Sequence, residues 1–265
     1  MKGEQVMGTP TIETHTDVMA KGGRLRIALP KGRLFESTVE LFTKAGITIE
    51  VKGREYKPRS SESGIELFII KPRNIPKMVE QGLIHAGIVG NDLVEDEGAK
   101  VDTVLDLGLM PVHIVVAGKK GMYENGFART EKLRVATEYA GIASEYFSKR
   151  GITFEILKTY GSTECFVPDF ADVIVDHAQT GSSLRENDLR VLDVVMSSST
   201  KIIAHKNLDT PHAKILQNIV ASIDAASKSI DRSYHGFLSA QDLRENKFVE
   251  TATGTQQQHT TTEGT

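Results

Sequence analysis

The chain has 265 residues, of which 39% are hydrophobic and 25% are charged, and its formal net charge is −3. This balance is typical of a soluble globular protein, gives no overall attraction to nucleic acid or to an anionic membrane, and leaves no apolar run of the roughly 20 residues that a membrane-spanning helix needs. The single cysteine, Cys165, excludes an intrachain disulfide and a cysteine-based zinc site, and we expect it to be a small buried hydrophobic residue of a cytoplasmic protein.

The N-terminal part predicts a flexible extension, a strand and a helix. Residues 1–23 are rich in Thr, Gly and charge and lack periodicity, which favours the extension. An apolar strand is expected over residues 25–29, and apolar side chains then recur at helical spacing up to Gly46. The turn between them carries Lys31 and Arg33, which either face an anion or are two solvated cations of an ordinary connecting loop.

The next part alternates short strands with short helices. Strands are expected over residues 47–51, 65–70, 86–90, 101–107 and 112–117. Pro72 and Pro76 precede a short helix that ends at Gly82. Asp92 follows the third of these strands, where it either contacts a ligand or caps the helix that runs to Glu97.

The same alternation continues to about residue 230. Further strands are expected over residues 134–137, 154–157, 173–175, 191–196 and 201–205. A helix is expected up to Arg150, and Ile215, Ile219 and Ile223 share one face of a later amphipathic helix. Because strands and helices alternate, the predicted fold class is α/β with mostly parallel sheets.

Residues 172–187 predict a phosphate-binding turn, because a buried strand there leads into a hydroxyl-rich bend and then a short helix. The backbone N–H groups of Gly181, Ser182 and Ser183 can converge on an anion at the helix N-terminus, while Asp176 can accept hydrogen bonds from sugar hydroxyls. The alternative is an ordinary helix start, since residues 183–186 also match the S-x-x-E capping box.

Several motifs occur in a fixed order along the chain. They are residues 25–34 (LRIALPKGRL), 75–76 (IP), 87–92 (GIVGND), 161–164 (GSTE) and 176–184 (DHAQTGSSL). Together they resemble the ATP phosphoribosyltransferase family of histidine biosynthesis over roughly residues 24–232. The resemblance implies two lobes similar to the type II periplasmic-binding-protein fold, with the active site in the interlobe cleft. It also implies that N1 of ATP attacks C1 of phosphoribosyl pyrophosphate (PRPP), with Mg²⁺ present, and releases pyrophosphate.

The same resemblance implies roles for particular residues. The PRPP-binding residues would be Asp176, Thr180, Gly181, Ser182, Ser183 and Leu184. The ATP-binding residues would be Arg33, Arg54, Lys71, Gly90 and Asp92, and the catalytic residues would be Lys31, Arg33 and Glu164. Such a reaction needs cations for the departing pyrophosphate and no covalent nucleophile. Mg²⁺ would be held mainly by substrate phosphates, with a carboxylate or two.

Four positions depart from the family pattern. Lys71 replaces an Arg, Asn74 replaces an acid, His113 lies where an Arg is frequent, and His177 replaces an apolar residue ahead of the Thr-Gly pair. Lys cannot reproduce a bidentate Arg clamp, so binding at position 71 differs from the family pattern. We expect His85, His113 and His177 to be structural or surface groups rather than bases.

The resemblance also predicts how the chain is organised. Lobe I would comprise residues 24–113 and 200–232, lobe II residues 114–199, and residues 233–265 would form a largely disordered tail that is too polar to bury a core. The chain resembles the short form of the family, a homodimer that assembles with a regulatory subunit similar to histidyl-tRNA synthetase. The alternative function is non-enzymatic binding of a small ligand, or an inactive paralogue with the same fold.

Overall fold

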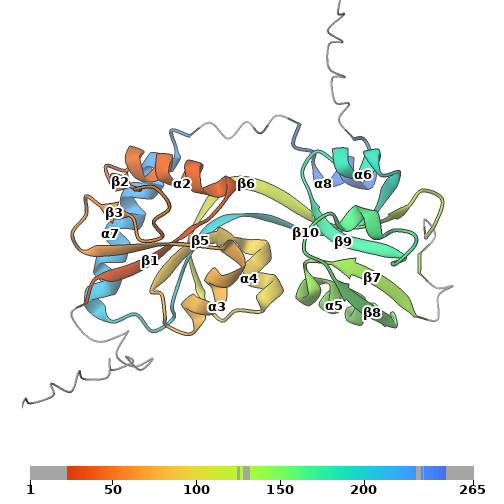
Figure 1. Cartoon of the computed structure of the whole chain (residues 1–265), viewed down its shortest axis with the longest axis horizontal. Coiled ribbons are helices and arrows are strands. Elements are labelled where there is room, and N and C mark those ends of the chain that lie inside the picture. The colour runs from red at the N-terminus through yellow and green to blue at the C-terminus, as the bar shows by residue number, and fades with distance from the viewer. Residues whose placement is uncertain (1–22, 124–125, 128–131, 231–233, 235, 249–265) are drawn as a thin grey trace, which may run out of the picture.

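The computed structural model describes residues 23–123, 126–127, 132–230, 234 and 236–248. Their main feature is an eight-stranded sheet with the strand order β4-β1-β5-β10-β6-β9-β7-β8, accompanied by a small sheet of β2 (Ile49–Glu50) and β3 (Arg59–Ser60). Figure 1 shows that the large sheet passes through two lobes, with strands β6 and β10 running between them. The expectation of an extension over residues 1–23 falls almost wholly outside the described residues.

Lobe I is built on three parallel strands, β1 (Leu25–Pro30), β4 (Ile65–Ile70) and β5 (Ala86–Gly90). The near-continuous apolar sequence of β1 suits a strand that is covered on both faces. Helices α2 (Arg33–Lys44) and α7 (Thr210–Ser227) bury their apolar stripes against one face. The other face is covered by the 3₁₀ turn η1 (Pro72–Asn74) with α3 (Ile75–Glu80) and α4 (Asn91–Glu97).

Lobe II repeats this plan with the parallel strands β7 (Leu133–Thr137), β8 (Phe154–Lys158) and β9 (Val173–Ala178). Helix α5 (Ala140–Lys149) packs on one face through side chains such as Phe147, which is fully buried. The 3₁₀ turn η2 (Thr163–Phe166), α6 (Ser182–Glu186) and α8 (Ala240–Arg244) contribute to the core on the other face.

Strands β6 (Asp102–Lys119) and β10 (Leu189–Ala204) connect the lobes as one long antiparallel pair. The sequence predicts four shorter strands there, and this prediction is wrong because polar residues in the middle of β10 stay in the ladder. Ser198 Oγ donates to Asp92 Oδ1 at 2.6 Å, and Thr200 Oγ1 donates to the Leu109 carbonyl at 2.9 Å. Register shifts along the pair mark the β-bulges that let long strands bend between lobes.

The α/β fold class is confirmed, but the sheet, the C-terminal tail and Cys165 differ from expectation. The sheet is mixed rather than mostly parallel, because β10 pairs antiparallel with β5 and β6, and β6 pairs antiparallel with β9. The proposed lobe boundaries after residues 113 and 199 fall inside β6 and β10. Residues 236–248 of the expected disordered tail carry α8, whose Leu243 is fully buried in lobe II, whereas residues 249–265 lie outside the described part. Cys165 is exposed instead of buried, because Thr163 and Val167 take the inward positions around it.

Candidate functional site

Strand directions bring the predicted site residues to the junction between the lobes. Because β5 and β6 run the same way and β9 runs against β6, the carboxyl ends of the parallel strands in each lobe point toward the other lobe (Figure 1). Lobe I therefore presents the residues after β1, β4 and β5, and lobe II presents those after β7, β8 and β9. Carboxyl ends of parallel strands are the usual ligand-binding edge of an open α/β sheet.

The phosphate turn, which we define as residues 179–183, follows β9 at this edge. Gly181 has a φ of +68°, a left-handed conformation that Gly adopts without strain. Thr180 Oγ1 and Ser182 Oγ lie 2.9 Å apart, so the two hydroxyls are gathered on one side of the turn. Within the described residues, the backbone N–H groups of Gly181 and Ser183 have no hydrogen-bond acceptor. Leu184, 2% exposed, packs in the lobe II core and anchors the turn instead of facing the junction.

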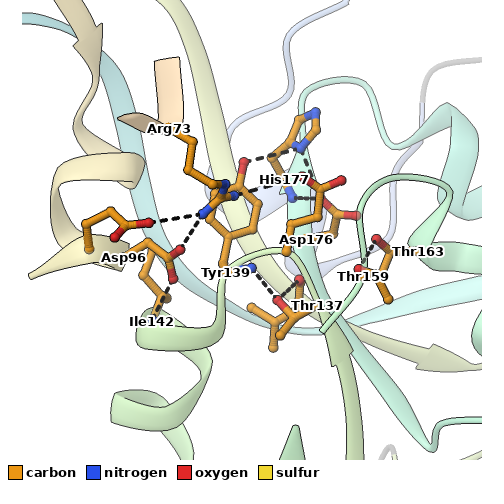
Figure 2. Close-up of polar contacts among 12 residues, drawn as sticks. Arg73, Asp96, Thr137, Tyr139, Ile142, Thr159, Thr163, Asp176 and His177 are labelled. Atoms are coloured by element: carbon orange, nitrogen blue, oxygen red, sulfur yellow. Dashed lines mark hydrogen bonds and ion pairs between the residues drawn. The ribbon is translucent and has the colours of Figure 1, made fainter. Parts of the chain in front are cut away.

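Asp176 and His177, at the end of β9, form an ion pair beside the turn. Asp176 Oδ1 accepts from the backbone N–H of His177 at 2.7 Å and from its Nδ1 at 3.0 Å, so both bonds fall on one carboxylate oxygen. The hydrogen bond to Asp176 raises the pKa of His177 above its ordinary value. Figure 2 shows the Tyr139 side chain next to this pair, with its hydroxyl 3.5 Å from His177 Nδ1.

Lobe I presents cations toward this pair. Arg33 is exposed at the start of α2, directly after β1, and its charge is the weakest of the influences on the pKa of His177, which it acts to lower. Lys31 Nζ donates to the Tyr56 hydroxyl at 2.9 Å, and this bond lowers the pKa of Tyr56. A pocket of about 440 Å³ is lined by Lys31, Arg54 and Tyr56 together with seven other residues, and Lys71 is close enough to Tyr56 to add to the lowering of its pKa.

Gly90 and Asp92 lie between β5 and α4 and have structural partners. Asp92 is only 7% exposed and makes two hydrogen bonds to Ser198. Its Oδ1 accepts from the Ser198 hydroxyl, and its backbone N–H donates to Ser198 Oγ at 2.8 Å. A Cβ on Gly90 would lie 2.3 Å from Asp92 Oδ1, so a side chain at position 90 would displace the Asp92 carboxylate. Asp92 therefore ties the edge of the site to β10, and the helix N-cap position is occupied by Gly90 rather than by Asp92.

The sequence motifs did not reveal a contact between the lobes that we call the interlobe clasp. It consists of Arg73, Asp96 and the N-terminus of α5. Asp96 Oδ2 accepts from Arg73 Nη1 at 2.7 Å, and Asp96 Oδ1 accepts from the backbone N–H groups of Gly141 and Ile142 at 2.8 and 3.2 Å. Arg73 also lies over the Tyr139 ring at 5.5 Å (Figure 2). Arg73, two positions after Lys71, was the only sequence feature that pointed to this contact. The fold was needed to show that its partner is Asp96.

Two other predicted positions are accounted for. Glu164 lies in η2, which follows β8 at the junction edge of lobe II, and among the described residues its side chain has no hydrogen-bond or ion-pair partner. His113 is a structural group, as expected, because its Nδ1 bonds Ser197 Oγ at 2.8 Å and its Nε2 bonds the Leu238 carbonyl at 3.1 Å. Burial lowers the pKa of His113. A pocket of about 370 Å³, lined in part by Asn91 and His113, lies over the middle of β6 and β10.

Comparison with known proteins identifies the family to which this chain belongs. The family model described as ATP phosphoribosyltransferase matches residues 71–225, which is more than half of the chain. The chain belongs to the ATP phosphoribosyltransferase family. Among its relatives, the ATP phosphoribosyltransferase of Koribacter versatilis is 34% identical over 213 residues, which cover 77% of this chain and 73% of that protein. The one from Aquifex aeolicus is 39% identical over 184 residues, which cover 69% and 86%.

Other members of the ATP phosphoribosyltransferase family are longer than the matched segment, which spans 65% of the protein from Desulforudis audaxviator at 35% identity. A solved structure titled "ATP phosphoribosyl transferase (HisG:HisZ) complex from Thermotoga maritima" shares the fold, with a TM-score of 0.69, 23% identity, and coverage of 78% of this chain and all of that one. The predicted family, its two-lobed fold and the enzyme class, a pentosyltransferase of histidine biosynthesis, are confirmed. Among the described residues, no helix combines the length and apolarity needed to span a membrane.

Proposed function

We propose that this chain transfers the 5-phosphoribosyl group of PRPP to N1 of ATP at the interlobe junction and releases pyrophosphate. The observation that carries the proposal is the opposition of two anion-facing turns, the phosphate turn of lobe II and the Lys31–Arg33 turn of lobe I. Both turns follow the carboxyl ends of parallel strands that point toward the other lobe. A reaction that joins two phosphorylated substrates needs such positive groups on both sides.

PRPP would bind on lobe II. Its 5-phosphate would accept from the backbone N–H groups of Gly181 and Ser183 and from the hydroxyls of Thr180 and Ser182, which lie on one turn. Since His177 occupies Asp176 Oδ1, the other carboxylate oxygen would accept from the ribose hydroxyls. Leu184 contributes by fixing the turn to the core rather than by touching the ligand.

ATP and the departing pyrophosphate would bind mainly on lobe I. The ATP phosphates would lie near Arg33, Arg54 and Lys71, where the pocket beside Tyr56 is bordered by cations. Gly90 would border the nucleotide through its backbone and Asp92 through its buried side chain. Glu164 would face the nucleotide from lobe II. This division leaves C1 of PRPP and N1 of ATP to meet at the junction.

The chemical step would depend on electrostatics and orientation. The C1–O bond to pyrophosphate lengthens first, which gives C1 oxocarbenium character, and N1 of ATP then forms its bond to the opposite face of C1. Lys31 and Arg33 would stabilise the negative charge that develops on the leaving pyrophosphate, while Asp176 would stabilise the positive ribose. The clasp through Arg73 and Asp96 would keep the lobes at the distance that this in-line arrangement requires.

Mg²⁺ suits this junction as an ion carried by the substrate. Among the described residues there is no group of three or more His, Cys, Asp or Glu side chains that could hold a metal ion, so most of its oxygen ligands would come from the diphosphate. The free oxygen of Asp176 and the carboxylate of Glu164 are hard donors of the type that Mg²⁺ prefers. When bound, the ion supplies positive charge for the leaving pyrophosphate.

The proposal extends to location and assembly. We expect a cytoplasmic enzyme that forms homodimers and assembles with a regulatory subunit similar to histidyl-tRNA synthetase. The shared fold with a chain from a complex named HisG:HisZ supports the expectation of a second kind of subunit. The lobe boundaries after residues 113 and 199 are part of the same proposal, with the hinge in β6 and β10.

A pyrophosphate-release assay with ATP, PRPP and Mg²⁺ tests the function. Release should require both substrates, and Arg33→Gln should lower kcat by about 10²-fold because it removes charge stabilisation of the leaving group. Lys149→Gln is the matched control, since Lys149 lies on α5, is 70% exposed and pairs only with Glu145 among the described residues. If wild-type protein binds PRPP but releases no pyrophosphate, the chain is a ligand-binding protein or an inactive paralogue.

A further inference from the structure

The last described segment of the chain packs against the phosphate turn. We call residues 236–248 the C-terminal strap. Helix α7 ends in lobe I, whereas the strap carries α8 beside α6 in lobe II (Figure 1). The chain therefore crosses between the lobes after α7, and the strap then lies next to the turn proposed to hold the 5-phosphate of PRPP.

The strap is built into lobe II. Its helix α8 begins with a capping box of Ser239 and Asp242, and Leu243 is fully buried in the same core cluster as Leu184. Asn246 makes two hydrogen bonds to one residue, since its Oδ1 accepts from the Val191 N–H at 2.7 Å and its Nδ2 donates to the Val191 carbonyl at 3.2 Å. Leu243 and Asn246 therefore fix α8 to lobe II.

Two strap residues contact the phosphate turn directly. The Leu238 N–H donates to the Gln179 carbonyl at 3.0 Å, while the Leu238 carbonyl is held by His113. The Phe248 ring lies against Gly181, because a Cβ built on Gly181 would be 2.2 Å from Phe248 Cδ1. One contact thus restrains the start of the turn, and the other covers its left-handed glycine.

The turn needs such support for physical reasons. Helix α6 has five residues, far fewer than the roughly 12 that an isolated helix needs in water, so it does not hold its own N-terminus. Gly181 has no side chain to limit its backbone, and the left-handed conformation is one of several that glycine adopts readily. An ordered phosphate site requires that neighbours remove this freedom before the ligand binds.

We propose that the C-terminal strap is a positioning element for the phosphate turn, with Phe248 and the Leu238 backbone as its two contacts. This inference rests on the proposed function, because it assigns the strap to the 5-phosphate subsite. Phe248 packs on the face of Gly181 where a side chain would be, and within the described part of the chain no acceptor competes with the ligand for the N–H groups of Gly181 and Ser183. Phe248 acts through the turn and touches no substrate.

Steady-state kinetics of the full-length Phe248→Ala variant test the proposal. We expect the KM for PRPP to rise about tenfold, because the turn must then be ordered at the expense of binding. The KM for ATP and kcat should change less than about twofold, since neither depends on the freedom of this turn. Phe248→Leu should restore most of the PRPP affinity, because a large apolar side chain again covers Gly181.

Hydrogen–deuterium exchange of the turn provides a readout that is independent of catalysis. Amides of residues 179–184 should exchange faster in Phe248→Ala and at the wild-type rate in Lys247→Gln, whose side chain pairs with Glu245 and does not contact the turn. If the exchange and the KM for PRPP both stay unchanged in Phe248→Ala, the proposal is overturned. It is also overturned if kcat and both KM values deteriorate together in Phe248→Ala and in Phe248→Leu, because that result indicates general destabilisation.

These outcomes separate the strap from the function of the site. A wild-type protein that releases no pyrophosphate contradicts the proposed function, yet faster exchange of the turn in Phe248→Ala would still support the link between strap and turn. An active wild-type protein with unchanged exchange and PRPP affinity in Phe248→Ala contradicts the strap alone.

Discussion

At the residue scale, the histidines of this chain differ sharply in environment. His177 is partly exposed and keeps its proton to a higher pH because Asp176 accepts from it. His85 is 1% exposed, accepts the Arg26 N–H through Nδ1 at 2.8 Å and stacks on His212 with ring centres 4.3 Å apart. Burial, followed by the charge of His212, lowers the pKa of His85 to about 4.

His85 makes stability depend on pH in a defined window. Its folded pKa of about 4 lies below the unfolded value of 6.5, so the unfolded chain binds more protons between these values. The contribution of neutral His85 is complete above pH 6.5 and is lost as the pH falls toward 4. We expect the free energy of unfolding to be about 2 kcal/mol lower at pH 5 than at pH 7 on this account.

Urea unfolding of wild-type protein and of His85→Gln at both pH values measures this effect. Glutamine keeps an acceptor for the Arg26 N–H but does not titrate, so the difference between the two proteins should shrink at pH 5 relative to pH 7. The same difference at both pH values would mean that His85 is not the group responsible.

At the scale of elements, the start of α5 depends on a side chain from the other lobe. The N-cap residue of α5, Tyr139, offers no side-chain cap, and Asp96 of α4 instead accepts from the first N–H groups of the helix. Gly141 permits this approach, because a Cβ there would be 2.0 Å from the Asp96 carbonyl oxygen. The two helices are therefore joined by a cap that no local sequence pattern contains.

Asp96→Ala should destabilise the protein by about 2 kcal/mol, because it removes a helix cap and leaves Arg73 without its closest carboxylate. Denaturant unfolding at neutral pH measures the change. Glu95→Ala is the control, since Glu95 is exposed on the same helix and caps nothing in the described structure. Equal effects of both substitutions would contradict the role of the cap.

At the scale of the whole molecule, charge is distributed unevenly. The net charge is −3, yet lobe I presents Lys31, Arg33, Arg54 and Lys71 at or near the junction. A local cluster of this kind attracts phosphorylated substrates even when the overall charge repels them. Salt screens such attraction over about 10 Å at 0.1 M ionic strength.

The KM for ATP should therefore rise severalfold between low salt and about 0.5 M salt, where screening is nearly complete. Arg54→Gln should flatten this dependence, because it removes one cation from the pocket beside Tyr56. Lys149→Gln, at the exposed C-terminal end of α5, should leave the slope as in wild type. Equal slopes for all three proteins would place the ATP phosphates away from Arg54.

The sequence alone determined most of the elements and the residue types at their ends. The apolar run of β1, the amphipathic stripe of α7 and the hydroxyl-rich bend after β9 each follow from local periodicity or local turn chemistry. Motif order was enough to predict the family and the two-lobed fold. Local patterns suffice here because these features depend on near neighbours in the chain.

Only the tertiary structure decided how distant segments cooperate. The polar middle of β10 remains part of one long strand, bulges included, where Ser198 bonds Asp92 of α4, and the C-terminal strap is fixed to lobe II because Leu243 is buried in its core. The clasp between Arg73, Asp96 and α5 likewise joins residues far apart in sequence. Contacts between residues far apart in the chain produce no periodic pattern in the sequence, so they are visible only in the folded structure.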